Sequence, residues 1–184
     1  MTHADPICAI AAYAVAGIVC DSIVKNPDVA AERLMDRVIA AESTYVFMHR
    51  GKDRFSDALK TALSLTGDPE ALWTFGSAGK SDSLTSVPMA IAIWRRHLAD
   101  AGPQPAVLEA INAGGDTDTV AAMVGAMMGA ADGRAGWWPT DWVEALRDRG
   151  ARPHRIGLDL WAVSSLRRMP EGYDLSEIKA SLGY

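Results

Sequence analysis

Hydrophobic residues recur with a helical period along almost the whole chain, and no segment alternates in the way a β-strand would. The first half predicts helices over residues 5–24, 26–39 and 53–65, followed by a short helix from Asp68 to Phe75. Prolines and acidic residues stand at the predicted helix starts, where proline costs nothing because the first N–H groups are unpaired anyway. The pattern therefore predicts an all-α fold.

The second half continues this pattern after a polar, glycine-bearing loop at residues 76–83. That loop is too long to be a simple turn, and it is either a surface linker or a binding loop on a helical scaffold. Helices are predicted on both sides of the segment at residues 114–119. The helices predicted after the loop cover residues 83–100, 104–113, 120–132, 140–149, 156–169 and 175–181.

The helix that follows Thr119 is uncharged and rich in small residues. Its larger side chains follow the i, i+3, i+4, i+7 rule, and its opposite side carries only alanine and glycine. A helix that is apolar on all sides is expected to be buried. We therefore predict a compact, orthogonal multi-helix bundle around this Ala/Gly/Met-rich central helix. The apolar stripe, which we assign to the core, consists of Val120, Met123, Val124, Met127 and Met128.

Composition is that of one globular domain over residues 1–184, with 49% hydrophobic and 22% charged residues. The net charge of −5 and the lack of a basic stripe argue against a nucleic-acid binder. The uncharged run from Pro6 to Cys20 is shorter than the roughly 20 residues of a membrane span, and no basic leader precedes it. These features predict a cytoplasmic protein without a membrane segment.

Cys8 and Cys20 are the only cysteines. On one straight helix they would lie about 18 Å apart along the axis, too far to form a disulfide. We expect two reduced, buried thiols without a metal role, because no Cys-x-x-Cys or Cys/His cluster is present.

Candidate chemistry concentrates in Gly114-Gly115-Asp116-Thr117-Asp118-Thr119, at the start of the central helix. Asp116, Asp118 and Thr119 offer oxygen ligands of the kind that Mg²⁺ or Ca²⁺ prefers, and the glycines allow a sharp turn or a close approach to a ligand. A plain helix start is the alternative, with Asp116 as N-cap and Asp118 favourable in the first turn. The segment is not an EF-hand loop, since Val120 stands at its fifth position.

Other candidate residues carry weaker signals. Gly79-Lys80-Ser81 lacks the glycine spacing and the preceding strand of a phosphate-binding loop. His49, His97 and His154 stand beside basic residues and are expected to be solvated. No serine, histidine and acid can be singled out as a triad.

Several blocks of the chain resemble the C-terminal half of the ADP-ribosylglycohydrolase domain. The most specific is the Gly-Gly-Asp-Thr-Asp-Thr segment with its Ala/Gly-rich helix, which Gly129-Ala130-Ala131-Asp132-Gly133 closes ahead of Trp138-Pro139 and Trp142. Ser86-Val87-Pro88 with Ala90-Ile91 is similar to the family's preceding loop and helix, and Thr2-His3-Ala4-Asp5 to its Thr-His element. The blocks follow the family's order and span most of the chain.

The resemblance implies metal-dependent hydrolysis of the N- or O-glycosidic bond of ADP-ribosylated proteins or small molecules, with release of ADP-ribose. Mg²⁺, as one or two ions, or Mn²⁺ would be held by Asp116, Asp118 and Thr119. The expected substrate-binding residues are His3, Gly79, Ser81, Ser83 and Gly115.

The resemblance also implies a gap. The family's first half, which carries the acid or base and further metal ligands, has no counterpart in these 184 residues. No catalytic residue is therefore named. The missing half could come from a second chain or from an upstream coding start, or self-association could cover the exposed face. A non-catalytic interaction or structural protein is the alternative function.

Overall fold

The computed structural model describes residues 5–45, 53–78, 82–100, 102–133, 139–146, 152 and 155–157. Contacts divide the chain into two units, Met1–Trp137 and Trp138–Tyr184, which we describe separately. All regular structure in the described ranges is helical, and the all-α prediction is confirmed. The prediction of one domain over residues 1–184 stays a prediction.

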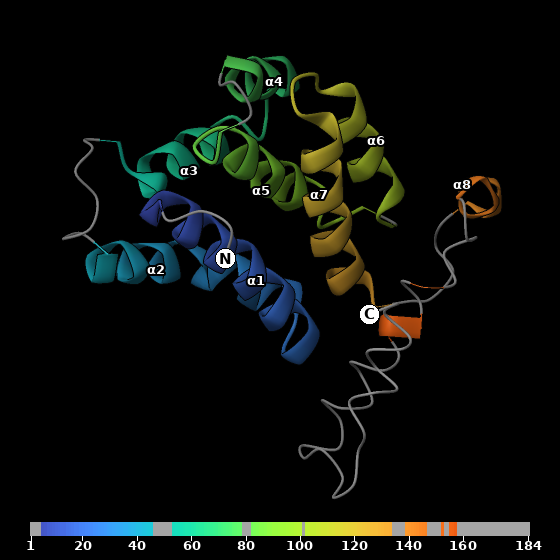
Figure 1. Ribbon diagram of the computed structural model, residues 1–184, viewed down its shortest axis with the longest axis horizontal. Coiled ribbons are helices and arrows are strands. Elements are labelled where there is room, and N and C mark those ends of the chain that lie inside the picture. Colours follow the sequence, from blue (N-terminus) through green and yellow to red (C-terminus); the bar gives the residue numbers. More distant parts are fainter. Residues whose placement is uncertain are drawn as a thin grey trace, which may run out of the picture. The chain divides into compact units, whose positions relative to one another are not determined.

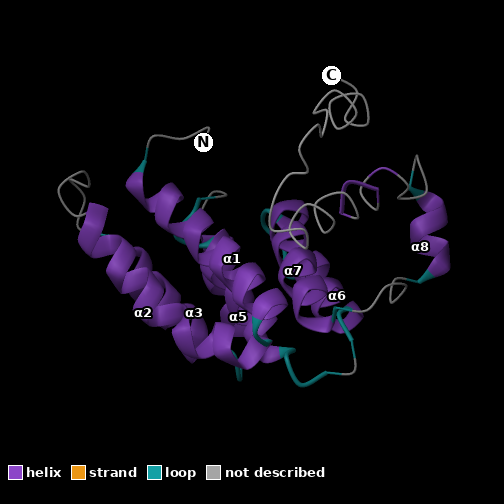
Figure 2. Cartoon of the chain, turned by 90° about the horizontal axis from the view of Figure 1, so that it is seen from below, coloured by secondary structure: helices purple, strands orange, loops and turns teal. Residues whose placement is uncertain are grey.

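Two long helices open the first unit, α1 (Pro6–Val24) and α2 (Pro27–Tyr45), and they pack side by side (Figures 1 and 2). Each begins where the sequence predicts. The Asp5 carboxylate accepts a hydrogen bond from the N–H of Ile7 at 2.8 Å. Asn26 Oδ1 accepts one from the N–H of Val29 at 2.8 Å. Both side chains satisfy a backbone donor that the helix itself leaves unpaired.

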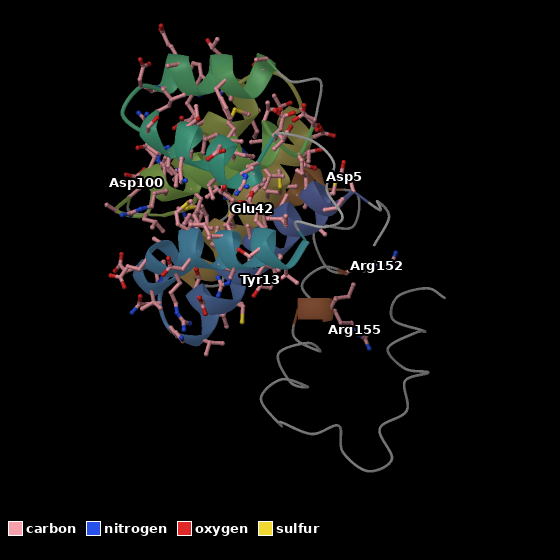
Figure 3. All side chains as sticks on the ribbon, turned by 90° about the vertical axis from the view of Figure 1, so that its left-hand side faces the viewer. Asp5, Tyr13, Glu42, Asp100, Arg152 and Arg155 are labelled. Carbon is pink, nitrogen blue, oxygen red and sulfur yellow. The ribbon has the colours of Figure 1, made fainter. Side chains whose placement is uncertain are left out.

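Two short helices follow, α3 (Phe55–Ser64) and α4 (Pro69–Ala78). Glu42 on α2, labelled in Figure 3, caps α3 from outside by accepting a hydrogen bond from the N–H of Ser56 at 2.8 Å. Asp68 caps α4 through the N–H of Ala71 at 3.1 Å, as predicted. Helix α4 extends to Ala78, so the predicted loop at residues 76–83 is wrong for its first three residues.

Gly76 lies in the last turns of α4 and packs against Met89 of α5. A Cβ on Gly76 would overlap the Sδ of Met89, so a larger residue there would force the Met89 side chain to move. Gly76 is therefore buried inside a helix and does not belong to the predicted loop.

Helix α5 (Ser86–Arg96) occupies the centre of the first unit. It lies between α3 and α7 in Figure 1, and it also contacts α1, α4 and α6. Its residues from Met89 to Trp94 are all buried, with at most 1% of each exposed. The predicted helix over residues 83–100 is therefore shorter than expected, and the structure places α5 rather than the helix after Thr119 at the centre.

Helices α6 (Gln104–Asn112) and α7 (Thr117–Asp132) pack against each other beside α5. One side of α7 belongs to the core, as predicted, through the buried residues Val120, Val124, Met127 and Met128. Ala122 and Ala126 on its other side are exposed. The expectation of burial on all sides is therefore wrong, because only one face of α7 meets described helices.

The second unit contains α8 (Thr140–Ala145), which lies within the predicted helix over residues 140–149. Residues 155–157 are also helical. Most of the helix predicted over residues 156–169, and all of that over residues 175–181, falls outside the described residues.

Helix α1 has the 19-residue length and the apolar composition of a membrane span, with one third of its most apolar window buried. The sequence predicted an apolar run too short for a membrane span, but the length of α1 does not support that prediction. A bundle helix passes the same test, and α1 contacts α2, α3, α5 and α7. Asp21 of α1 pairs with Arg37 of α2 at 2.7 Å, which fits a helix in a folded bundle.

Both cysteines lie on α1 and are free, as predicted. The expectation that both are buried is wrong, since Cys20 is exposed and Cys8 is half-buried. Cys8 Sγ lies 3.2 Å from the Oγ of Ser83.

Candidate metal and substrate site

Gly114 and Gly115 turn the chain from α6 into α7. Their φ angles are +78° and +73°, in the left-handed region that side-chain-bearing residues rarely adopt. This explains why two glycines stand here. The turn delivers Asp116 to the N-cap position of α7 and places Asp118 in its first turn.

Asp116 stands at the N-cap but makes no side-chain capping hydrogen bond. The pKa of Asp118 is lowered, and the largest cause is the nearby Asp116 carboxyl group, which can donate a hydrogen bond to the Asp118 carboxylate only while Asp116 itself is protonated. Backbone N–H groups of Thr119 and of Asp118 itself lower that pKa further. The positions given by the capping alternative are confirmed, with Asp116 at the N-cap and Asp118 in the first turn, but the Asp116 side chain makes no capping hydrogen bond.

Solvent reaches this group of oxygens. Asp118 and Thr119 are exposed, and Asp116 and Thr117 are half-buried. A carboxylate has about four acceptor positions, so the backbone contacts of Asp118 do not exhaust it. Two adjacent carboxyl groups with a nearby hydroxyl are hard oxygen donors of the type that Mg²⁺ takes. Within the described ranges, however, no three His, Cys, Asp or Glu side chains gather as a metal-binding group.

The glycine turn lies against the end of α4. A Cβ on Gly115 would be 3.6 Å from the Cα of Ser77, and a Cβ on Gly114 would be 3.5 Å from its Oγ. Ser77 also lines a broad surface depression of about 640 Å³. The side chains around this depression come from one face of α4 and belong to Glu70, Trp73, Thr74, Ser77 and Ala78.

Sequence reasoning missed this depression. Its residues follow a helical i, i+3, i+4, i+7, i+8 spacing, which the sequence does display. The spacing does not show which residues lie beside this face of α4. Gly115 is distant in the sequence and comes to lie beside Ser77 only in the folded chain.

The predicted substrate-binding residues are only partly described. Gly115 lies beside Ser77, as above, and half-buried Ser83 lies beside Cys8. His3, Gly79 and Ser81 fall outside the described residues. The same holds for His49 and His154.

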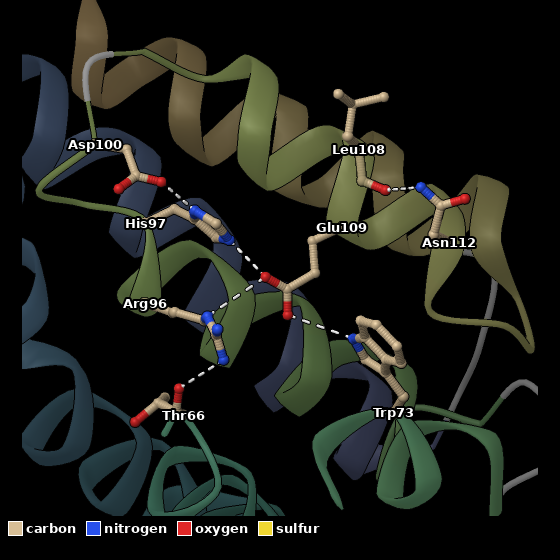
Figure 4. Close-up of polar contacts among 8 residues, drawn as sticks. All are labelled: Thr66, Trp73, Arg96, His97, Asp100, Leu108, Glu109 and Asn112. Carbon is tan, nitrogen blue, oxygen red and sulfur yellow. Dashed lines mark hydrogen bonds and ion pairs between the residues drawn. The ribbon is translucent and has the colours of Figure 1, made fainter. Parts of the chain in front are cut away.

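His97 corrects the expectation of a solvated histidine. Only 13% of its side chain is exposed, and its ring is held between two carboxylates (Figure 4). Nδ1 contacts Asp100, and Nε2 lies 2.5 Å from Oε2 of Glu109 on α6. Glu109 also pairs with Arg96 at 3.5 Å and accepts a 3.4 Å hydrogen bond from the indole N–H of Trp73. The basic neighbours of His97 suggested exposure, but its partner comes from another helix.

The described residues form a helical bundle in which a glycine turn with two acids leads into the small-residue helix α7. The family model of ADP-ribosylglycohydrolase matches residues 1–170, and the chain belongs to this family. Members are all-α hydrolases that are typically metal-dependent. No curated protein and no solved structure matches the chain.

Proposed function

We propose that this protein catalyses metal-dependent hydrolysis of the N- or O-glycosidic bond of ADP-ribosylated substrates and releases ADP-ribose. Family membership supports the reaction class. The observation that carries the site is that Asp116 stands at the N-cap of α7 without a side-chain capping hydrogen bond, with a second acid, Asp118, in the same first turn. Two acids held together at an exposed helix start cost the fold repulsion, which a bound cation would remove.

Asp116, Asp118 and Thr119 would hold Mg²⁺ or Mn²⁺ in this proposal. A divalent cation supplies Lewis-acid polarisation and orients the reacting groups. The protein's own contribution is rigid placement, because buried Val120 and Val124 anchor the first turns of α7 in the core. Gly115, without a Cβ, leaves room for the substrate beside the oxygens.

ADP-ribose is the ligand that the family membership supports, and Gly115 and Ser83 are its proposed contacts among the described residues. Gly79, Ser81 and His3 are proposed on the resemblance alone. Cytoplasmic localisation is likewise a proposal.

Calorimetric titration of Mg²⁺ into the full chain with ADP-ribose present tests the site. We expect saturable binding by the parent protein and none by the double variant Asp116→Asn, Asp118→Asn. Asp28→Asn is the matched control, because Asp28 is also an exposed acid in the first turn of a helix. Equal binding by the parent and the double variant would overturn the assignment of these ligands.

Release of ADP-ribose from a modified protein, measured with Mg²⁺ and with a chelator, tests catalysis. The parent protein with Mg²⁺ should release ADP-ribose faster than the double variant does. Equal rates, together with intact cation binding, would mean that the chain binds its ligand without hydrolysing it.

Exposed apolar side chains on α1 favour a second candidate function, a non-catalytic role in protein association. Tyr13, Ile23 and Val24 are 53%, 68% and 71% exposed. Ile23 and Val24 are adjacent at the end of α1, and neighbouring exposed apolar groups are typical of surfaces that bind another chain. Size-exclusion chromatography, combined with the calorimetric titration of Mg²⁺ and ADP-ribose, separates the two candidate functions. An oligomer that binds neither Mg²⁺ nor ADP-ribose fits only the role in protein association.

A further inference from the structure

Both ring nitrogens of His97 face carboxylates, although the ring is largely buried. His97 stands at the C-cap of α5, and 13% of its side chain is exposed. Nδ1 contacts Oδ2 of Asp100, three residues further along the chain, and Nε2 contacts Oε2 of Glu109 on α6 (Figure 4). The two carboxylates differ in their access to water, since 40% of the Asp100 side chain is exposed and 10% of that of Glu109.

The number of protons on the ring decides whether both contacts are hydrogen bonds. A neutral imidazole has one N–H donor and one acceptor nitrogen, whereas an imidazolium has two N–H donors. An ionised carboxylate only accepts hydrogen bonds. A neutral ring therefore donates to one carboxylate and turns a lone pair to the other. Only the imidazolium form of His97 can donate to Asp100 and Glu109 at the same time.

Arg96 is the other charged group of this cluster. Its Nε lies 3.5 Å from the same Oε2 of Glu109 that His97 contacts, and its Nη1 donates to the backbone oxygen of Thr66 at 3.0 Å. Across the described parts of the chain, α1, α3, α4 and α7 place no ionisable side chain in hydrogen-bond or ion-pair contact with His97. Helix α4 contributes the neutral indole N–H of Trp73, which donates to Glu109 at 3.4 Å. With an imidazolium at residue 97, the charges of Arg96 and His97 balance those of the two acids.

A neutral ring would keep Glu109 and release Asp100. Leaving a carboxylate without a donor costs more where water cannot replace the donor, and Glu109 is the less exposed of the two acids. Asp100 can exchange the ring for water. The backbone N–H of Asp100 donates to the backbone oxygen of His97 at 3.1 Å, so the side-chain contact closes a short turn directly after α5.

From this geometry we propose that His97 is a pH-sensitive switch in the turn at residues 97–100. The doubly protonated ring holds Asp100 against the end of α5, and loss of one ring proton to solvent frees the Asp100 side chain. The switch acts in the range of roughly pH 5 to 8, in which histidine changes its charge. Its contribution to stability is present on the acid side and declines as the pH rises. The proposal does not depend on the proposed catalytic function.

Urea unfolding of the full chain at several pH values tests the switch. His97→Gln keeps a hydrogen-bond donor but cannot change its charge. Between about pH 5 and about pH 8, the ratio of folded to unfolded parent protein should fall about two- to five-fold relative to this variant, the range for an ion pair with an exposed partner. Comparison with the variant cancels the titration of the other histidines. A difference in unfolding free energy that stays constant over this range would overturn the proposal.

Asp100→Asn offers the neutral ring a partner of the matching kind. An asparagine amide can donate to Nδ1 while Nε2–H donates to Glu109, so neither form of the ring is left with an unsatisfied contact. We expect this variant to lose most of the parent's pH dependence. Asp57→Asn is the matched control, because Asp57 is an exposed acid that pairs with Lys60 at 3.6 Å, and it should keep that dependence. Equal pH dependence in the two variants would contradict the double contact.

Nuclear magnetic resonance on the ¹⁵N-labelled full chain gives a local readout that needs no unfolding and no comparison with His97→Gln. The backbone amide signal of Asp100 should shift with pH over the histidine range in the parent and shift less in Asp100→Asn. The Trp73 indole signal, assigned by its loss in Trp73→Phe, reports on Glu109 and should move less than the Asp100 amide. An Asp100 amide that does not respond to pH would overturn the switch. A larger response of the Trp73 indole would overturn the assignment of Asp100 as the acid that is released.

Discussion

Asp21 and Asp118 are two aspartates with lowered pKa values and opposite surroundings. Asp21 is buried on α1, and the Arg37 guanidinium is the main cause of its lowered pKa. Asp118 is exposed at the start of α7, and its principal partner is a second acid, Asp116. One carboxylate is neutralised within the fold, and the other is held beside a group of the same charge.

This difference separates a structural acid from a candidate functional one. Arg37 lies against Gly17 of α1, and a Cβ at residue 17 would overlap the arginine side chain and force it to move. The arginine also lies 5.9 Å from the centroid of the Tyr13 ring. The surroundings of Asp21 are thus arranged to stabilise it. The groups that lower the pKa of Asp118 are the neighbouring Asp116 carboxyl group and backbone N–H groups of its own helix, with no cation among them, so its negative charge stays available to a ligand.

The largest expected effect comes from removing the charge of Asp21. Asp21→Asn leaves Arg37, only 16% exposed, without its anionic partner. We expect the free energy of unfolding to fall by about 2 kcal/mol, the range for a lost hydrogen bond between charged groups. Urea unfolding followed by circular dichroism measures this, with Asp28→Asn as the exposed control. An unchanged midpoint would mean that the pair contributes nothing to stability.

Acid should remove the same contribution without a mutation. The pKa of Asp21 is lower in the folded protein than its ordinary value of 3.8. Its stabilisation is therefore complete above that ordinary value, and it declines as the pH falls through the lower, folded pKa. The difference in unfolding free energy between the parent and Asp21→Asn should shrink as the pH is lowered below about 4. A constant difference would contradict the assigned cause.

A smaller effect is expected at the glycine turn. Gly114→Ala forces a side-chain-bearing residue into φ +78° while its Cβ meets only ordinary contacts. The conformational cost should be about 1 kcal/mol. Gly67→Ala is the control, because a Cβ there meets nothing within 4 Å and its φ is not positive. Equal thermal unfolding midpoints for the two variants would show that the turn is not strained.

The helices and their starts could be predicted from sequence because their causes are local. Asp5, Asn26 and Asp68 cap helices within three residues of themselves, and the hydrophobic period needs only its own segment. The central position of α5 could not be predicted, since a continuous apolar run does not specify which helices will surround it.

The candidate site was predictable in part for the same reason. Asp116, Asp118 and Thr119 stand together in the chain, so their proximity follows from spacing. The contacts of His97 with Glu109, and of Gly115 with Ser77, join different helices and appear only in the fold. The spacing also could not show that the Asp116 side chain makes no capping hydrogen bond at the start of α7.

The smallest change in stability is expected for Asp118→Asn, and it distinguishes Asp118 from the structural acid Asp21. Asp118→Asn removes a favourable interaction with the N-terminus of α7 and, at the same time, the repulsion from Asp116, so the two effects oppose each other. Without metal, the free energy of unfolding should change by less than about 0.5 kcal/mol, as at an ordinary surface position. Added Mg²⁺ should raise the thermal midpoint of the parent and of Asp21→Asn but not that of Asp118→Asn, because only a ligand that binds the folded state stabilises it. A large loss of stability in Asp118→Asn without metal would place this aspartate with Asp21 as a structural residue.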